Sequence, residues 1–455
     1  MSQHYSVQVL EYKFGKELAA ELDTNSFAKN NWPVVYVLSH QNTKLAYVGE
    51  TADALNRLNT HLNHEKKGKL SSAHIVCSNT FNKSATLDIE SKLIRYMAAD
   101  DNFKLMNGNL GLADHNYYQK EELYSQLFTD VWGKLRAAGL AKHSLEYINN
   151  SDLFKYSPYK SLSHDQVQGL KAILKGIPSD CVKSLVINGG ARTGKSVLAI
   201  FLFKLLHSGE NDVNFREFSD DENEMRLLVN KVRKNYPNPK MALVVPMSSF
   251  RKTLQKAFAG VDGLSRKMVV GPADVSKETY DIILIDESHR LRKRKNLGAY
   301  FRAFDKAAHR LGFEREKCNE LDWMLKQSDK SIFFYDRYQS IKPSDVDRSA
   351  FENLERSKQT KLLELKSQFR VQAGDDYVDF VKRLLDNKLG DSTTYSPMNY
   401  ELVMFDSPQA LVSAIHKKDD EHGLARLIAG YSWPWVSKKD TGKYDIQLGD
   451  VRLME

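Results

Sequence analysis

Cysteine is scarce in this chain, with three residues among 455. Cys77, Cys181 and Cys318 lie far apart, and none has the CxxC or cysteine–histidine spacing of a zinc site. A disulfide framework and a structural zinc ion are therefore not expected. Three free thiols fit a reducing compartment.

Long hydrophobic runs are also missing. The longest apolar stretch, 196–206, is interrupted by Lys204 and is too short to cross a bilayer. Residues 1–13 contain no basic stretch followed by an apolar core, so they predict no secretion signal. No internal repeat or low-complexity tract is evident. We therefore expect a cytoplasmic protein without a membrane partner.

The remaining composition is that of an ordinary folded protein, with 42% hydrophobic and 27% charged residues. A chain of this length exceeds what one hydrophobic core usually supports, so two or three domains are expected. Lysine and arginine number 66 against 58 acidic residues, a formal net charge of +8. This surplus favours polyanionic partners such as nucleic acid, although many unrelated proteins share it.

The first block of the chain, 31–112, begins with β-rich runs. Runs at 34–38 and 45–48 are separated by a polar turn, which predicts a hairpin. Helical periodicity follows at 52–64 and again at 86–99. These patterns predict a small α+β domain.

A different pattern begins after residue 163, beyond a helix-favouring linker and a loop-like junction. Short apolar runs typical of buried parallel strands alternate with helical segments. The runs are 184–188, 241–245, 281–285 and 331–335. The charged stretch 214–235 predicts a solvated helical insertion. We therefore expect an α/β domain with a doubly wound parallel sheet.

Residues 189–196 fit the phosphate-loop pattern GxxxxGK[ST] and lie between an expected strand and an expected helix. Glycines let backbone N–H groups face the phosphates of a nucleotide. A lysine then supplies charge to the β- and γ-phosphates, and a serine holds Mg²⁺. We therefore expect ATP and Mg²⁺ to bind through Gly189, Gly190, Ala191, Arg192, Thr193, Gly194, Lys195 and Ser196.

Two acids, Asp286 and Glu287, end the apolar run at 282–285. An ATPase needs one carboxylate to hold Mg²⁺ and another to orient the attacking water. In isolation such a strand end is mostly structural. Downstream of a phosphate loop it predicts Asp286 as the metal-side carboxylate and Glu287 as the base.

These motifs resemble those of superfamily 1 helicases, and most closely the Schlafen group 3 helicase domain, whose DE[AS]H-R-L string matches 286–291. The resemblance covers 162–455 and implies RecA-like motor lobes. It also implies that Pro246-Met247-Ser248 contacts the strand. Four further roles follow from it: Gln166 reads adenine, Gln339 senses the γ-phosphate, Phe369 stacks on adenine and Arg370 reaches the γ-phosphate.

Taken singly, each of these short motifs is equally compatible with a structural role, and their order along the chain favours the functional one. The basic run 290–295 has two interpretations, a contact with a phosphate backbone or a solvated helix face. The chain stops at Glu455 before the final helicase motifs are identifiable, so we expect an incomplete second lobe. Unwinding is therefore left open.

The amino-terminal hairpin carries Val34-Val35-Tyr36 and Tyr47-Val48-Gly49, which resembles the GIY-YIG nuclease signature, although valines replace its glycine and isoleucine. Arg57 follows Tyr47 by ten residues, and His61 follows Arg57 by four, which places both on one helix face. Glu90 lies in the next expected helix and Asn107 in a Gly/Asn-rich loop.

Phosphodiester cleavage needs a metal ion to polarise the scissile phosphate, a positively charged side chain to offset the developing charge, and a base for the attacking water. Glu90 is the expected ligand of one Mg²⁺, or Mn²⁺, and the planar fork of Arg57 suits the phosphate. The resemblance assigns Tyr36, Tyr47 and His61 to a proton-relay cluster. It also implies that Gly49 permits close backbone approach and that Asn107 braces the site. The alternative is that the tyrosines pack in a core and the glutamate is solvated.

We therefore expect a metal-dependent endonuclease coupled to a nucleic-acid-dependent ATPase or helicase, with DNA favoured over RNA by family analogy. The same analogy suggests a role in defence against phage or foreign DNA. An ATP-gated switch and a host repair nuclease are the alternatives. The expected segments are an extension over 1–30, the nuclease domain over 31–115, a helical linker over 116–160, and motor lobes over 161–348 and 349–455.

Overall fold

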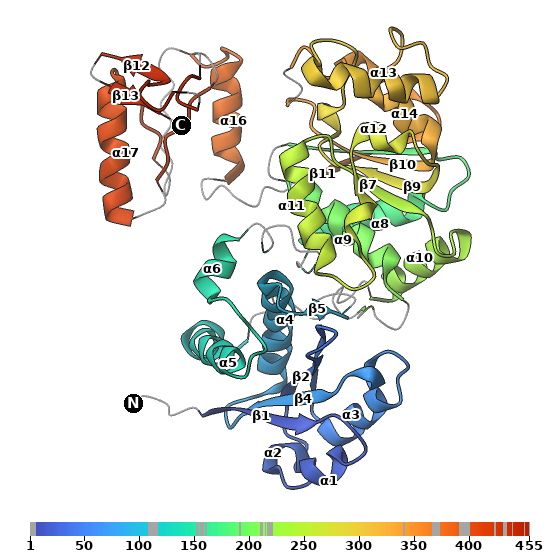
Figure 1. Ribbon diagram of the computed structural model, residues 1–455, viewed down its shortest axis with the longest axis vertical. Helices are drawn as coiled ribbons and strands as arrows, with labels where there is room; N and C mark the ends of the chain where they lie inside the picture. The colour runs from blue at the N-terminus through green and yellow to red at the C-terminus, as the bar shows by residue number, and fades with distance from the viewer. Residues whose placement is uncertain are drawn as a thin grey trace. The chain divides into compact units, whose positions relative to one another are not determined.

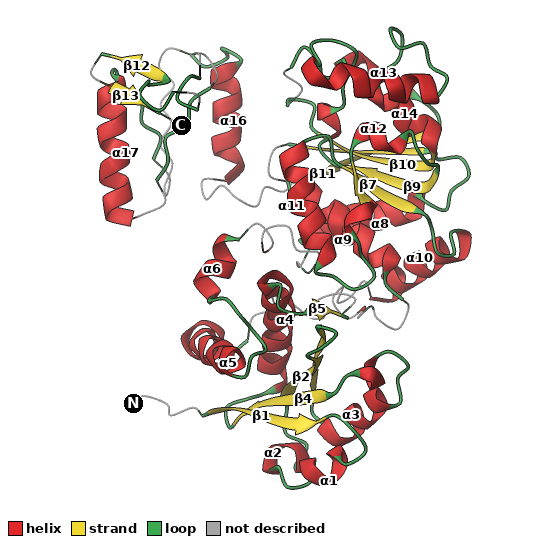
Figure 2. Cartoon of the chain, in the orientation of Figure 1, coloured by secondary structure: helices red, strands yellow, loops and turns green. Residues whose placement is uncertain are grey.

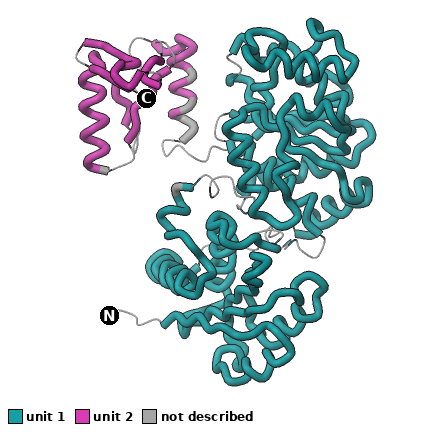
Figure 3. The backbone as a smooth tube through the Cα atoms, viewed as in Figure 1, with its two compact units in different colours: residues 1–369 teal, residues 370–455 magenta. Residues whose placement is uncertain are grey.

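The computed structural model divides into two compact units, residues 1–369 and 370–455 (Figure 3). The structure describes residues 6–107, 117–151, 154, 159, 162–190, 193–209, 213, 215, 222–339, 342–365, 374–390, 401–422, 425–430, 435–438, 440–449 and 451–454. Among these residues, no helix is both long and apolar enough to cross a bilayer.

The amino-terminal half of the first unit is a five-stranded sheet with helices on both faces (Figure 1). Its strands are β1 (Val7–Lys13), β2 (Val34–His40), β3 (Leu45–Thr51), β4 (Ser72–Ser78) and β5 (Lys104–Leu105). Their order is β1-β4-β2-β3-β5, and only the β3–β5 pair is parallel. The helices are α1 (Leu18–Leu22), α2 (Ser26–Lys29), α3 (Ala54–Leu62) and α4 (Lys83–Asp100).

Strand β2 explains the two-sided packing of this sheet. Its side chains alternate between faces, and nearly all of them are buried. Val35 and Val37 join the core beneath α4, whereas Tyr36 and Leu38 join the core beneath α1 and α3. The predicted hairpin is confirmed as β2 and β3, and the two predicted helices are confirmed as α3 and α4.

Residues 1–30, which were expected to form an extension before the nuclease domain, contribute a strand to this sheet. Strand β1 pairs along its whole length with β4, and Phe14, Leu18 and Leu22 are buried in the core next to β2. After the sheet come the π-helix η2 (Lys120–Tyr124) and the α-helices α5 (Ser125–Ala137) and α6 (Leu145–Asn150). Phe128 and Trp132 of α5 pack on Tyr96 of α4.

The second half of this unit is built on a six-stranded sheet in which every pair is parallel. Its strands are β6 (Ser184–Gly189), β7 (Met241–Val244), β8 (Val269–Val270), β9 (Tyr280–Ile285), β10 (Ser328–Tyr335) and β11 (Thr360–Leu365). Their order is β11-β6-β10-β9-β7-β8. Parallel pairing requires crossovers, and helices provide them.

Helices cover both faces of the parallel sheet (Figure 2). One face packs against α8 (His164–Gly176), α9 (Lys195–His207), α10 (Glu222–Asn235) and α11 (Ser248–Ala259). The other packs against α12 (Pro272–Val275), α13 (Phe301–Arg310), α14 (Glu320–Gln327) and α15 (Arg348–Arg356). Short 3₁₀ turns are η5 (Arg266–Met268), η6 (Ser288–Arg290) and η7 (Gly298–Tyr300). The doubly wound α/β fold is confirmed, and the sheet has the architecture of a RecA-like lobe.

Strand β11 lies beyond residue 348, where the first lobe was expected to end. It pairs in parallel with β6, from Thr360 opposite Ser184 to Leu365 opposite Gly189. The exposed side chains of this edge strand weaken its apolar signal, which explains why it was not predicted. The first sheet therefore extends to Leu365.

Hydrogen bonds and one backbone bridge join the five-stranded sheet to the parallel sheet within the first unit. Leu105 of β5 forms an isolated parallel bridge with Val261, and Asp262 N donates to Leu105 O at 3.0 Å. Lys204 of α9 donates to Asp262 O at 2.9 Å, and the buried Tyr159 hydroxyl donates to Asn107 O at 2.7 Å. The helix after the phosphate loop is thus connected to the strand preceding Asn107.

The second unit contains α16 (Gly374–Leu385), α17 (Pro408–His422) and the antiparallel pair β12 (Ile446–Leu448) and β13 (Val451–Leu453). Asp445, before β12, accepts hydrogen bonds from Val436 N, Ser437 N and the Ser437 hydroxyl. The predicted nucleotide contacts Phe369 and Arg370 lie outside the described residues.

Candidate functional site

The hairpin and α3 bring together four of the predicted nuclease residues. The Tyr36 hydroxyl and His61 Nε2 are 2.9 Å apart, and the Tyr47 ring lies 5.2 Å from the His61 ring. Arg57, one turn before His61 on α3, interacts with both tyrosine hydroxyls. Helical spacing therefore places Arg57 and His61 on the face that covers the hairpin.

Burial and nearby cations keep His61 neutral. Desolvation, assisted by Lys67, Arg57 and His64, lowers the pKa of His61 to about 3. Lys67 lies over the Tyr47 ring, with Nζ 3.9 Å from its centroid. Desolvation also raises the pKa of Tyr36 well above its ordinary value. At neutral pH the cluster therefore holds a protonated phenol beside an unprotonated imidazole, as a proton relay requires.

Glu90 faces the same cluster from α4. Burial, followed by the charge of Glu50, raises the pKa of the Glu90 carboxyl to about 8. Lys83 partly opposes this effect, and its Nζ lies 2.6 Å from Glu50 Oε1. A buried carboxylate next to a second one favours a bound cation, so Glu90 fits the predicted metal ligand. Among the described residues, no group of three or more candidate ligands surrounds it.

Asn107 and Gly49 hold the hairpin in shape. The Asn107 side chain accepts from Val48 N at 3.1 Å and donates to Val48 O at 2.8 Å. Gly49 lies opposite Tyr36 in the register, and a Cβ at Gly49 would lie 2.3 Å from the Tyr36 hydroxyl. Only glycine permits this approach. These hydrogen bonds hold Asn107 against the hairpin, and its predicted role as a brace of the nuclease site stays a prediction.

The phosphate loop lies between β6 and α9. Gly194 adopts a left-handed φ of 77° and begins α9, so the helix amino terminus is directed at the loop. Lys195 Nζ donates to Gly189 O at 2.6 Å and to Gly190 O at 2.8 Å. It also lies 3.6 Å from Asp336 Oδ2. Incoming phosphates would replace these partners.

Asp286 and Ser196 lie together, as an Mg²⁺ site needs. Burial, then Glu287, raises the pKa of Asp286 to about 6, and Ser196 favours its charged form. Asp286 Oδ2 is buried without a hydrogen-bond partner in the described part of the chain. A metal ion would satisfy this oxygen, so the pair fits Mg²⁺.

Glu287 remains ionised beside a buried histidine. Its left-handed backbone, φ 51°, turns the chain after β9 into η6. Burial opposes ionisation, but His289 Nε2, 3.1 Å from Glu287 Oε2, outweighs it and holds the pKa of Glu287 below its ordinary value. An ionised carboxylate one residue after Asp286 suits the base predicted there.

Gln166 and Gln339 have different partners, and only Gln166 contacts the phosphate loop among the contacts of the described residues. Gln166 forms a capping box with Ser163 at the start of α8, and its Nε2 donates to Gly194 O at 3.2 Å. Its side chain thus braces the phosphate loop. Gln339 N donates to Asp336 O at 3.3 Å, after β10. The nucleotide roles predicted for both glutamines stay predictions, and Ala191 and Arg192 lie outside the described residues.

Three residues that contact the predicted site residues escaped the sequence analysis. Glu50 and Lys83 meet Glu90 from β3 and α4, and Asp336 meets Lys195 from the end of β10. Glu50 directly follows the predicted Tyr-Val-Gly string, and Asp336 lies three residues before the predicted Gln339, so both were available as neighbours of motif residues. Nothing local marked either as a partner of a distant residue.

The fold and the two sites define a class of protein in which a nuclease-type hairpin precedes a nucleotide-binding motor lobe. The model of the Schlafen group 3 DNA/RNA helicase domain matches residues 183–454, and that of the GIY-YIG catalytic domain matches 33–98. The chain therefore belongs to the Schlafen group 3 helicase family and carries a GIY-YIG domain in the same polypeptide.

A more distant relative is an uncharacterized protein of Saccharomyces cerevisiae, 22% identical over 291 residues. The match covers 58% of this chain and 57% of the yeast protein, so the chain spans little more than half of that relative. Together the two matched domains imply nuclease activity, a nucleotide-binding motor and nucleic-acid binding.

Proposed function

We propose that this protein is a metal-dependent DNA endonuclease coupled to a nucleic-acid-dependent ATPase, serving defence against foreign DNA. The observation that carries the proposal is that two separate clusters of polar side chains, each suited to binding phosphate, lie in one polypeptide. Tyr36, His61 and Glu90 meet at one, and Lys195 and Asp286 at the other. DNA and defence rest on family analogy.

In the nuclease centre, Arg57 would hold the phosphate with its planar fork. The Tyr36 hydroxyl would accept a proton from the attacking water as its own proton passes to His61 Nε2, 2.9 Å away. Mg²⁺ held by Glu90 would offset the charge that develops on the scissile phosphate. The low pKa of His61 leaves its nitrogen free to accept that proton at neutral pH.

In the ATPase centre, Lys195 would exchange the loop carbonyls for the β- and γ-phosphates. Ser196 and Asp286 would hold Mg²⁺, and Glu287 would orient the attacking water. ATP binding in the nucleotide lobe would affect cleavage through the nucleic-acid strand that this lobe holds. Because the nuclease domain is tethered to the lobe, the local concentration of substrate at the cutting site would rise to roughly the millimolar range.

A switch without strand translocation is the second candidate, and the Lys195–Asp336 ion pair favours it. The pair lies within 3.6 Å and joins the loop to the segment after β10. ATP would release Asp336 by occupying Lys195, which changes the contacts of that segment without hydrolysis. Turnover indifferent to nucleic acid would support the switch over the motor.

The test compares full-length wild type, Glu90→Gln and Lys195→Ala on labelled DNA and RNA of matched sequence, with Mg²⁺ and ATP. We expect Glu90→Gln to cut about 10²–10⁴-fold more slowly, because it removes a metal-binding charge. Lys195→Ala should lose ATP binding and strand-stimulated turnover. The exposed Glu65→Gln and Lys183→Ala serve as matched controls.

Undiminished cutting by Glu90→Gln would disprove the nuclease site, and retained ATP turnover in Lys195→Ala would disprove the ATPase site. Preferential cutting of RNA would overturn the choice of DNA. If the protein cleaves branched duplexes in preference to plain or modified ones, repair of host DNA is favoured over defence as its role.

A further inference from the structure

The amino-terminal part of α4 presents a row of polar side chains to the end of β3. Thr86 follows Lys83 by three residues and Glu90 follows Thr86 by four, a spacing that places them on one face of the helix. Glu50, the second-last residue of β3, meets this face. Its carboxylate accepts from the Thr86 hydroxyl at 3.4 Å, and its backbone donates a hydrogen bond to Glu90. The two glutamates therefore belong to one cluster.

Lys83 holds a positive charge against Glu50. Lys83 Nζ lies 2.6 Å from Glu50 Oε1 and 2.5 Å from Glu50 Oε2, so the ammonium contacts both carboxylate oxygens. The Glu50 side chain is only 10% exposed. A carboxylate with so little access to water needs a cation beside it. The position next to Glu50 is therefore one that this fold supplies with positive charge.

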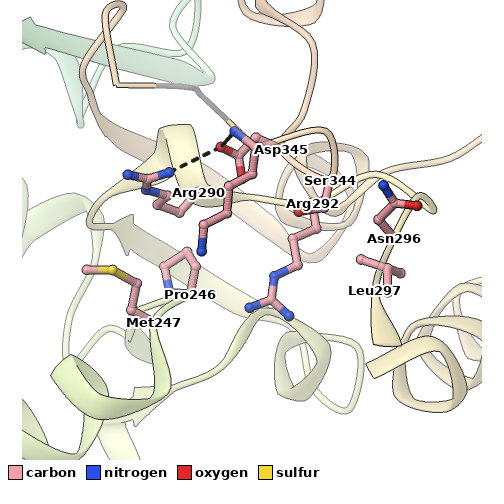
Figure 4. Close-up of a pocket in the computed structure, with 9 residues that line it drawn as sticks. Pro246, Met247, Arg290, Arg292, Asn296, Leu297, Ser344 and Asp345 are labelled. Carbon is pink, nitrogen blue, oxygen red and sulfur yellow. Dashed lines mark hydrogen bonds and ion pairs between the residues drawn. The ribbon is translucent and has the colours of Figure 1, made fainter. Parts of the chain in front are cut away.

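Lys83 can leave this position at little cost in free energy. Its side chain is 51% exposed, so the ammonium stays hydrated when it turns away from Glu50. The ion pair of Arg290 and Asp345 is different, because both partners are largely buried in the wall of the pocket of about 320 Å³ shown in Figure 4, with 19% and 3% of their side chains exposed. Release of Arg290 would leave Asp345 buried without that cation. Of these two pairs, Lys83–Glu50 is the one suited to exchange its cation.

A divalent ion matches this cluster better than the lysine does. Two ionised carboxylates carry two negative charges, and the ammonium of Lys83 balances one of them. Mg²⁺ takes oxygen ligands from one or two protein carboxylates, and water and substrate phosphate supply the rest. Mn²⁺ accepts the same kinds of ligand. Glu50 and the 9% exposed Glu90 provide such a pair of carboxylates.

We propose that Glu50 and Glu90 together hold the divalent ion of the nuclease centre, and that Lys83 occupies Glu50 until the ion binds. The inference rests on the proposed metal-dependent nuclease. The family resemblance assigns the ion to Glu90 alone, so Glu50 is an additional ligand and Lys83 is a competitor of the ion. This competition lowers the affinity of the centre for the ion while no substrate phosphate is present to supply further ligands.

The test measures the binding of Mn²⁺ to the full chain by isothermal titration calorimetry, without nucleotide or nucleic acid. Every protein in the series carries Asp286→Asn, which removes the proposed ion site of the motor lobe. Glu90→Gln then identifies the heat that belongs to the nuclease centre. Glu50→Gln, Lys83→Met and the double variant are compared with the parent protein.

Substitutions on the two sides of the ion pair should shift the Mn²⁺ affinity in opposite directions. Glu50→Gln should weaken binding by about 10–100-fold, because it removes a charged ligand. Lys83→Met should strengthen binding by about threefold, the factor that corresponds to an exposed ion pair, because the competing cation is lost. Lys83→Met should have little further effect when it is added to Glu50→Gln, since the two residues no longer interact.

Lys92→Met is the matched control. It breaks a second ion pair on α4, in which Lys92 Nζ lies 2.8 Å from Asp88 Oδ2 and which includes no residue of the cluster. Its Mn²⁺ affinity should equal that of the parent protein. If the Lys83–Glu50 pair has only a structural role, Lys83→Met and Lys92→Met will behave alike.

Unchanged Mn²⁺ affinity in Glu50→Gln, or affinity in Lys83→Met no higher than in the parent protein, would overturn the inference. So would a titration in which Glu90→Gln removes no heat. Because Lys83 is exposed, its substitution leaves the core intact, and the direction of its shift decides the question if Glu50→Gln misfolds. A wild-type protein that binds Mn²⁺ through both glutamates but cuts neither DNA nor RNA would refute the proposed nuclease and not the ion site, so the two failures are distinguishable.

Discussion

The Tyr36 hydroxyl lies at the middle of the proposed nuclease centre. It is fully buried, its hydroxyl is 2.9 Å from His61, and it interacts with Arg57. A buried phenol between a neutral base and a guanidinium can pass a proton without leaving its rotamer. The sequence predicted Tyr36, Arg57 and His61 together because two of them share one helix face and the third lies in a recognisable strand.

Replacement of Tyr36 by phenylalanine tests this arrangement. We expect DNA cleavage to fall by about 10²–10⁴-fold, because the ring stays packed while the proton path is lost. Cleavage rates under single-turnover conditions measure the effect. Tyr12→Phe is the control, since it removes the hydroxyl that accepts from Asn25 Nδ2 at 2.9 Å in the same domain. Equal rates for the two variants would rule out a relay through Tyr36.

Residues outside the motifs were less predictable. Glu50 shifts the pKa of Glu90 and Asp336 pairs with Lys195, yet neither has a local signature. Each acts on a residue far along the chain, and pairwise electrostatics depend on distance in space.

At the scale of elements, the β2–β3 hairpin determines the geometry of the proposed nuclease centre. Tyr36 and Gly49 face each other in the register, and Asn107 fastens the strand at Val48. Two β-rich runs separated by a polar turn made this hairpin visible in the sequence. In the structure both faces of β2 are buried, one on α3 and the other on α4.

Gly49→Ala should therefore affect both stability and cleavage. The new Cβ would lie 2.3 Å from the Tyr36 hydroxyl, so the ring must move away from His61. We expect a loss of about 1–3 kcal/mol in the free energy of unfolding and at least a tenfold loss of cleavage. Urea denaturation and cleavage assays measure the two effects.

Gly133→Ala is the matched control. Gly133 lies inside α5, where a Cβ meets open space, so alanine should stabilise the protein by about 0.5–1 kcal/mol. A Gly49→Ala protein as stable and active as Gly133→Ala would show that the close approach has no consequence.

For the whole molecule, the continuous core of the first unit is the main finding. One hydrophobic cluster includes Val35 of the nuclease sheet, Trp132 of the linker and Leu185 of the parallel sheet. Tyr159 lies in this cluster and donates to Asn107 O. The nuclease and the nucleotide lobe are therefore packed together within this unit.

Tyr159→Phe tests this connection. We expect the free energy of unfolding to fall by about 1–3 kcal/mol, since a buried carbonyl loses its partner. Amide hydrogen exchange at Leu105 and Met106 should also accelerate. Tyr118→Phe, on an 82% exposed side chain, is the control. Unchanged stability and exchange in Tyr159→Phe would show that the hydroxyl does not join the two halves.

The sequence by itself determined the phosphate loop, the acids after β9, the hairpin and the spacing of Arg57 and His61. These features are local, because each depends on residues within one turn, one strand or one helix. Tertiary structure alone decided that β11 joins β6, that Glu50 faces Glu90, and that Arg290 and Lys342 share a pocket. The physical reason is that strand order and inter-element contacts depend on how whole faces are buried, which no short stretch of sequence specifies.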